Sequence, residues 1–314
     1  MSVRVTISQD GTRKYAFGLG GELQAEAAFF RVPGRERPNI ACVSTQVGCA
    51  VGCPFCATAR SPFVRDLTTE GILLQIASIV DDQCAADIFR EGFEVSFMGM
   101  GEPLANLRNL LAAIREVRGR YPEITRVSVS TAGPAMRIER LTEAMPASVP
   151  VHLQVSLHAT SDEVRRKLIP RAPETIANLL EAGWKFHQKT GDQVFLNYVL
   201  LKGINDRDQD ARWLAKLDRE AFYLKISALN RVAGLPSDLV PASMSDIQRF
   251  SAILTSEGAP HKVFVGDGLD VLASCGQLAA RPLEVSVVLM PFHRKMGDQE
   301  SAHAGHFADF RRRA

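Results

Sequence analysis

The sequence predicts an α/β protein organised as a partial (β/α)6 barrel with a small antiparallel β extension at its N-terminus. Short apolar runs alternate with amphipathic stretches of helical length from residue 39 to residue 258, which is typical of parallel βαβ units. About six such units fit, fewer than the eight of a closed (β/α)8 barrel. The first forty residues instead show short alternating runs broken by turn residues.

The N-terminal segment contains three stretches with the alternation of strands. Turn residues at Asp10-Gly11 and in "GLGG" (18–21) separate them. We therefore expect a small antiparallel sheet over residues 1–38, with strands within 2–8, 10–19 and 22–32.

Residues 39–282 carry the predicted barrel. The expected strands and the helices that follow them are 39–45 and 68–80, 93–98 and 106–117, 126–131 and 136–145, 151–157 and 161–168 with 176–190, 194–201 and 208–217, and 222–229 and 244–258. Catalytic residues of such barrels gather at the C-terminal ends of the strands. The polar motifs at those ends are "GMGEP" (99–103), "STAG" (130–133), "SLHA" (156–159) and "ALNR" (228–231). Residues 283–314 are expected to form one more apolar strand and a polar tail.

Composition indicates an ordinary globular protein, with 46% hydrophobic and 23% charged residues. The sequence shows no leader and no apolar run that could cross a bilayer, so we expect a cytoplasmic protein without a membrane partner. Clustered cysteines in that compartment favour metal binding or redox catalysis over structural disulfides. The net charge of +2 leaves the partner open, and the basic stretches 31–38 and 310–314 are typical of a solvated loop and a solubilising tail.

Four of the six cysteines lie within residues 42–56. Cys49, Cys53 and Cys56 form C-x3-C-x2-C, a short glycine-containing spacing that lets several thiolates face one point. Three thiolates on a cubane of four irons leave one iron open to a small chelating molecule. Zinc is the alternative, but a structural zinc site closes with four ligands, and Cys42 lies on an expected strand. The pattern favours a [4Fe-4S] cluster.

This spacing resembles that of the radical S-adenosylmethionine (SAM) enzymes, whose open iron binds the amino and carboxylate groups of SAM. The order of the motifs "CVSTQVGCAVGCPFCATA", "FMGMGEPLAN", "VSTAG", "SLHA", "YVLLKGIND" and "SCGQLA" narrows the resemblance to the adenine-C2/C8 RNA methylases, the RlmN and Cfr family, over roughly residues 11–281. The resemblance implies a radical-SAM barrel, a [4Fe-4S] cluster, SAM, an RNA substrate, and a reducing flavoprotein or ferredoxin as electron source.

The resemblance also gives two further cysteines a role. C2 of adenine is not nucleophilic, so direct transfer of a methyl cation to it should be slow. The family first methylates a cysteine, here Cys275, and a 5′-deoxyadenosyl radical then removes hydrogen from the S-methyl group. The carbon radical adds to the base, and a second cysteine, here Cys42, attacks the Cys275 sulfur, forms a disulfide and frees the product. Cys84 matches no family position and is expected to be a partly buried structural cysteine.

The resemblance carries binding residues over position by position. Gly101 and Glu102 are expected at the SAM amino group, because a carboxylate suits an ammonium. The residues expected to hold the ribose and carboxylate ends of SAM are Ser130, Ser156, Leu157, His158 and Asn230. The alternative for each is a strand-end residue that caps the next helix. Glu26 matches a proton acceptor of the family, and the alternative is an exposed surface glutamate.

Three departures from the family leave the substrate open. We expect the helical N-terminal accessory domain to be absent, since the chain begins almost at the small sheet. The strand before the C-terminal cysteine region, 263–271, lacks its usual arginines, and 228–234 ("ALNRVAG") differs from the family's "PFNP". Phosphate neutralisation dominates RNA affinity, so two hypotheses stand. The protein methylates adenine in RNA, or it applies the same chemistry to a small molecule or nucleotide in a biosynthetic pathway.

Overall fold

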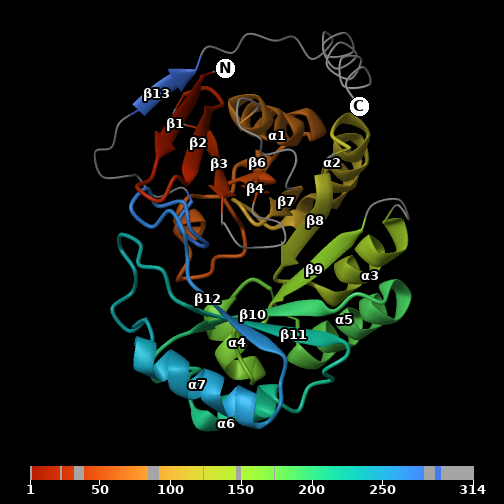
Figure 1. The fold of residues 1–314 in the computed structure, drawn as a ribbon, viewed down its shortest axis with the longest axis vertical. Coiled ribbons are helices and arrows are strands. Elements are labelled where there is room, and N and C mark those ends of the chain that lie inside the picture. Colours follow the sequence, from red (N-terminus) through yellow and green to blue (C-terminus); the bar gives the residue numbers. More distant parts are fainter. Residues whose placement is uncertain are drawn as a thin grey trace, which may run out of the picture.

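One mixed sheet of eleven strands organises the protein, in the spatial order β12-β11-β10-β9-β8-β7-β4-β3-β2-β1-β13 (Figure 1). It is seen in a computed structural model that describes residues 2–21, 23–31, 39–83, 92–122, 124–145, 150–172, 174–278 and 287–290. Cys84, most of the basic stretch 31–38 and the polar tail beyond residue 290 lie outside the described residues.

Seven neighbouring strands of this sheet run parallel to one another. They are β4 (Asn39–Cys42), β7 (Phe93–Phe97), β8 (Ile124–Thr131), β9 (Val151–Ser156), β10 (Val194–Leu200), β11 (Phe222–Ala228) and β12 (His261–Phe264). The first six are each followed by a helix, as the sequence predicts. The α/β class and the largely parallel sheet are therefore confirmed, and β12 adds a seventh parallel strand.

The helices lie along the outer side of the curved sheet (Figure 1). They are α1 (Thr69–Gln83), α2 (Leu107–Arg120), α3 (Ala135–Ala144), α4 (Asp162–Leu168), α5 (Ile176–Thr190), α6 (Asp208–Leu214) and α7 (Met244–Ser256), with the 3-10 turns η1 (Ala57–Arg60) and η3 (Pro103–Asn106). Apolar side chains such as Ile72, Ile76 and Val95 are fully buried in the main core, where each contributes about 1.5–3 kcal/mol. The helices thus occupy one face of the strands and leave the other face for a site.

The N-terminal strands β1 (Val3–Ile7), β2 (Arg13–Gly18) and β3 (Gln24–Arg31) are antiparallel, as expected. β3 also pairs with β4, so the extension continues the main sheet. β13 (Val287–Met290), within the apolar run expected to form a strand, pairs with β1. The two ends of the described chain therefore meet at one edge of the sheet (Figure 1).

Two local features differ from the sequence interpretation. The segment 263–271 is a strand only as far as Phe264, because the chain then turns at Gly268, which has a φ of +66°. A second, two-stranded sheet joins β5 (Gln46–Val47) to β6 (Arg65–Asp66). Strands of two residues carry no periodicity that a sequence could reveal.

Gln75 of α1 fixes the chain between Cys42 and Cys49. Its Oε1 accepts from Ser44 N (2.9 Å) and its Nε2 donates to Ser44 O (3.0 Å), both in the interior. Ser44 Oγ in turn accepts from Met100 N (2.7 Å) and donates to Glu26 O. One buried amide therefore links the helix layer to the ends of three strands.

We predict that Gln75→Ala lowers the free energy of unfolding by about 1–3 kcal/mol, because it leaves a buried backbone N–H and C=O without partners. Denaturant titration of the purified protein measures this change. Gln248→Ala, an exposed glutamine of α7, is the matched control and should change the free energy by less than about 0.5 kcal/mol. Equal effects of the two substitutions would contradict a special role for Gln75.

Candidate active site

The three closely spaced cysteines lie on one loop between β5 and η1. Gly52, between Cys49 and Cys53, has a φ of +76°, a conformation that side-chain-bearing residues rarely adopt. Cys56 N donates to Cys53 O (3.0 Å), which closes the turn. The loop is also held from outside, since Arg171 N donates to Val51 O (3.2 Å).

The surroundings of this loop favour protonated thiols, whose protons a bound cluster would displace. Burial raises the pKa of Cys49 to about 11, while the N–H groups of Val51 and Gly52, which donate to its sulfur, act in the opposite direction. Burial, followed by the charges of Cys56 and Cys49, raises the pKa of Cys53 well above its usual value. Bound iron would replace these protons.

The donor set of the loop fits a [4Fe-4S] cluster. Three half-buried thiols on one turn, with backbone N–H groups directed at sulfur, are the soft ligands that such a cluster requires. Among the described residues, no three His, Cys, Asp or Glu side chains are grouped closely enough to share one metal ion. That observation concerns a single ion, whereas each thiolate on a cubane binds a different iron.

Gly101 and Glu102 lie at the turn after β7. Gly101 has a φ of +99°, and a Cβ on it would lie 2.5 Å from Gln46 Cβ, so only glycine fits. The buried Glu102 carboxylate accepts from Leu104 N (3.0 Å), Thr131 Oγ1 (2.6 Å) and Ala132 N (2.9 Å). Burial is the largest influence on the pKa of Glu102 and raises it. Glu102 therefore caps η3, as the alternative interpretation holds, and also ties the ends of β7 and β8 together.

Ser130, Ser156, Leu157 and His158 lie at the ends of the next two strands. Ser130 Oγ accepts from Asn197 Nδ2 (3.2 Å), and Asn197 Oδ1 is buried without a partner among the described residues. Half-exposed hydroxyls next to an unsatisfied amide oxygen are suited to the polar groups of a bound molecule such as SAM.

His158 is a structural link. Its φ is +54°, its Nδ1 accepts from Val199 N (3.1 Å), and its ring meets that of Phe55 edge-on with 5.3 Å between centroids. Burial, with a smaller effect of the Arg165 charge, lowers the pKa of His158 to about 3, so the imidazole is neutral at pH 7. His158 thereby packs the end of β9 against the cysteine loop.

Arg165, which the sequence interpretation missed, is fully buried beneath these motifs. Its guanidinium donates to four backbone carbonyls, at 2.7 Å for Ala132, 3.1 Å for Glu174 and 3.2 Å for Ala172 and Ser156. Its charge also acts on the nearby Cys53. One side chain of α4 thus fixes the strand ends that carry "STAG" and "SLHA".

The loop that bears Cys275 is hydrogen-bonded to the cysteine loop. Ala57 N, next to Cys56, donates to Gly276 O (2.7 Å), next to Cys275. Asn230, expected at SAM, donates from Nδ2 to Ser274 Oγ (3.1 Å) and Cys275 O (3.0 Å). The structure therefore brings Cys275 to the C-terminal ends of the strands, beside the three cysteines.

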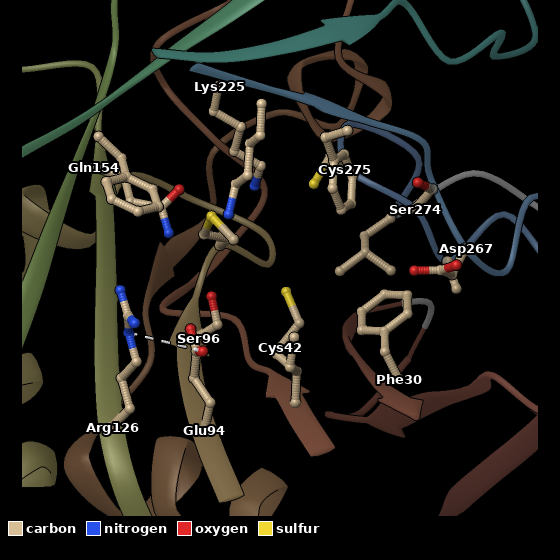
Figure 2. Close-up of a pocket in the computed structure, with 17 residues that line it drawn as sticks. Phe30, Cys42, Glu94, Ser96, Arg126, Gln154, Lys225, Asp267, Ser274 and Cys275 are labelled. Carbon is tan, nitrogen blue, oxygen red and sulfur yellow. Dashed lines mark ion pairs between the residues drawn. The ribbon is translucent and has the colours of Figure 1, made fainter. Parts of the chain in front are cut away.

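Cys42 and Cys275 both line one cavity of about 240 Å3. Figure 2 shows Cys275 and Lys225 entering it from one side and Cys42, Glu94 and Arg126 from the opposite side. Cys42 is buried at the end of β4 and Cys275 is exposed, and both are free thiols. Burial, then the Cys275 charge, raises the pKa of Cys42 to about 12.

Glu26 lies on β3 and is buried, which rules out an exposed surface glutamate. Its Oε2 lies 2.9 Å from Lys14 Nζ, which also donates to Leu272 O (3.2 Å), three residues before Cys275. Glu26 is not among the described residues that line the cavity. The acids there are Glu94 and Asp267, so a role for Glu26 as proton acceptor stays a prediction.

The polar inner face of the barrel is the feature that sequence reasoning overlooked. Glu94, Arg126, Gln154 and Lys225 all line the cavity from parallel strands. When helices cover one face of a strand and the other face lies inside a barrel, both faces are buried. The sequence of such a strand is then a nearly continuous run of apolar residues. The signal was available, because each of these residues interrupts such a run with a charged or amide side chain.

Comparisons with known proteins agree with this geometry. The Radical SAM superfamily model matches residues 43–214. The chain is 40% identical over 287 residues to the "Probable dual-specificity RNA methyltransferase RlmN" of Thermus thermophilus, covering 89% of this chain and 78% of the relative. It is 34% identical over 290 residues to the "Dual-specificity RNA methyltransferase RlmN" of Wolinella succinogenes, covering 88% and 79%.

A solved structure is similar as well. The crystal structure of a radical SAM methyltransferase from Sphaerobacter thermophilus superposes with a TM-score of 0.77 at 33% identity, covering 88% of this chain and 80% of that chain. Among the described residues, no helix combines the length and hydropathy of a membrane-spanning segment. The barrel, the three-cysteine loop and these matches together place the chain in the radical SAM superfamily and, within it, among the RlmN-type methyltransferases.

Proposed function

We propose that this protein methylates an sp2 carbon of adenine, C2 or C8, in RNA through a methyl group carried on Cys275. The observation that carries the proposal is that Cys42 and Cys275 line one cavity beside the three-cysteine loop. The RNA substrate is supported by the relatives, which are named RNA methyltransferases.

The residues of the chain have separate tasks in this scheme. Cys49, Cys53 and Cys56 would hold the [4Fe-4S] cluster, and Glu102 with Ser130, Ser156, Leu157, His158 and Asn230 would surround SAM. When bound, the cluster and SAM supply the methyl group and the radical that removes a hydrogen atom from it. A reducing flavoprotein or ferredoxin would deliver the electron. Asn230 contacts the Cys275 backbone, so it would keep the sulfur next to the cofactor.

Cys42 would resolve the covalent adduct between Cys275 and the base, after that adduct has given up one electron, which a bound cluster could accept, and the proton of the attacked ring carbon. The Cys42 sulfur attacks Cys275 Sγ, an S–S bond forms, and the bond from Cys275 Sγ to the methylene carbon breaks. The electron pair goes to that carbon, which takes up a proton and becomes the methyl group. A thiol reductant must then reduce the disulfide. Burial raises the pKa of Cys42, so its thiol must give up a proton before it attacks, since the thiolate is the nucleophile.

A second candidate is the same chemistry on a small molecule or free nucleotide. It is favoured by Asp267, an acid that lines the cavity from the segment 263–271, where the family is expected to carry arginines. An anionic side chain there would repel an RNA backbone.

The first prediction concerns the cluster. Purified without oxygen, the protein should contain about four irons per chain, and Cys49→Ala, Cys53→Ala or Cys56→Ala should each abolish iron binding. Iron assay and absorption spectroscopy measure this. Cys84→Ala is the matched control and should retain its iron. Stoichiometric zinc without iron in the wild-type protein would contradict the cluster.

The second prediction concerns SAM. Glu102→Gln keeps much of the hydrogen bonding of the carboxylate but removes its charge, so SAM affinity should fall about tenfold or more while iron content stays the same. Calorimetric titration under anaerobic conditions measures the affinity. Glu174→Gln, a carboxylate that also accepts a backbone N–H, is the control and should bind SAM normally. Unchanged affinity in Glu102→Gln would remove Glu102 from the SAM site.

The third prediction tests the proposed function itself and separates the two catalytic cysteines. Mass spectrometry of the wild-type protein should find one added methyl group on the peptide with Cys275, and Cys275→Ala should form no product. Cys42→Ala should still be methylated on Cys275 but should purify with substrate covalently attached, because the resolving thiol is missing. The attached mass identifies RNA or a small molecule. Normal turnover by Cys42→Ala without an adduct would disprove the two-cysteine mechanism.

A further inference from the structure

The cavity between Cys42 and Cys275 contains polar groups that the transfer of a methyl group does not require. They are the ammonium group of Lys225 on β11, the amide group of Gln154 on β9 and the hydroxyl group of Ser96 on β7. None of the residues expected to bind SAM lines this cavity. These groups therefore face the space left for the substrate, and a role for them in substrate binding rests on the proposed function.

Lys225 is a half-buried cation that has no anionic partner among the described residues. Within the described part of the chain it makes no hydrogen bond and no ion pair, and its Nζ lies over the Phe264 ring, 4.4 Å from the centroid. Two further cations line the cavity. Arg126 lies 3.9 Å from Glu94, which also accepts from Ser128 Oγ (2.6 Å), and Lys262 Nζ lies over the Phe195 ring, 4.9 Å from its centroid. Figure 2 shows Lys225 pointing into the cavity, across from Arg126 and Glu94. A partly desolvated ammonium that lacks a counter-charge is suited to an anionic group of a ligand.

Gln154 and Ser96 are polar side chains that the fold leaves unsatisfied. Gln154 is 5% exposed and Ser96 is fully buried. Gln154 Oε1 and Ser96 Oγ have no hydrogen-bond partner among the described residues. Buried polar atoms are normally paired, so unpaired ones at a cavity wall indicate a ligand. An amide can both donate and accept in one plane, which matches an adenine edge that presents a ring nitrogen beside an amino group.

The walls and the size of the cavity fit a single nucleotide. Phe30 supplies an aromatic surface against which a base can stack, whereas Lys225 and Lys262 lie over the rings of Phe264 and Phe195. A volume of about 240 Å3 is close to the lower end of small-molecule sites, about 300–1,000 Å3. The cavity thus admits one base and its adjoining groups, and the remainder of a polynucleotide would stay outside.

We infer that Lys225 and Gln154 are specificity-determining residues for the adenine nucleotide of the proposed reaction, with Gln154 hydrogen-bonded to the edge of the base and Lys225 paired with a phosphate group. The nucleotide comes either from RNA or from a free nucleotide, and both share this chemistry. Lys225 and Gln154 add to the residues that the family resemblance supplies.

Calorimetric titration of the cluster-loaded protein tests the inference, with S-adenosylhomocysteine in excess to fill the cofactor site. The probes are adenosine monophosphate, adenosine, cytidine monophosphate and a five-nucleotide RNA in which a central adenosine is flanked by uridines. Among the phosphate-containing probes that bind the wild type, Lys225→Met should lower the affinity about tenfold or more. The same substitution should change the affinity for adenosine less than about twofold. Gln154→Leu should reduce the ratio of the affinity for adenosine monophosphate to that for cytidine monophosphate about tenfold.

Controls separate a binding role from a structural one. Lys225→Arg keeps the charge and should stay within about threefold of the wild type, and Lys216→Met, an exposed lysine on the chain just after α6, should change nothing. For the oligonucleotide, Lys225→Met should also reduce the slope of log affinity against log salt by about 0.7, the contribution of one phosphate contact on a single strand. A merely structural lysine would leave that slope unchanged.

The outcomes also distinguish the two sources of the nucleotide, RNA and a free nucleotide. Binding of adenosine monophosphate as tight as that of the oligonucleotide supports a free nucleotide, and binding of the oligonucleotide alone supports RNA. Unchanged affinity and salt slope in Lys225→Met, or no binding of any probe by the wild type, would overturn the inference. If the proposed function were wrong instead, Cys275 would lack its methyl group while the titrations could still succeed.

Discussion

The hydrogen bond from Ala57 N to Gly276 O joins two loops that are more than two hundred residues apart in the chain. The proposed chemistry requires this contact, because the sulfur that carries the methyl group must lie beside the cluster that starts the radical step. Ala57 begins the short 3-10 turn η1, and the described residues around Cys275 form neither a helix nor a strand. Thr58 Oγ1 adds a second bond to Leu278 O (3.1 Å), and Gln277 Nε2 donates to Arg231 O (3.1 Å). The position of Cys275 is thus set by several bonds to the rest of the site.

The N-terminal extension fixes the same loop from its other side. Gly268 N donates to Asp10 Oδ2 (2.7 Å), Gln9 N donates to Asp270 Oδ2 (3.1 Å), and Lys14 Nζ donates to Leu272 O. The buried Lys14–Glu26 pair costs desolvation free energy that apolar side chains would not. Its position explains why the cost is tolerated, since Lys14 connects the extension to the backbone that leads to Cys275. The small sheet is therefore part of the site's scaffold as well as an edge of the barrel.

Sequence reasoning located the elements and proposed the reactive residues, but it did not find the residues that organise them. The alternating runs predicted the six strand–helix pairs, and the spacing of Cys49, Cys53 and Cys56 predicted their shared loop, since both signals are local. Arg165 was missed because its four carbonyl partners come from three separate segments, which only the folded chain brings together. The burial of Glu26 was left open for the same reason. Its partner Lys14 lies on a neighbouring strand, and the sequence does not give the strand register.

The two faces of the parallel strands explain how one scaffold can keep its chemistry and change its substrate. The outer face must remain apolar, because the helices pack on it. The strand ends are constrained by Arg165 and Glu102, whose hydrogen bonds go to backbone groups that an apolar substitution would leave unpaired. The inner face carries neither constraint, since Ser96 Oγ and Gln154 Oε1 have no hydrogen-bond partner in the part of the chain that the structure describes. Substitutions at inner positions such as Lys225 can therefore change the lining of the cavity between the two cysteines without disturbing the three-cysteine loop.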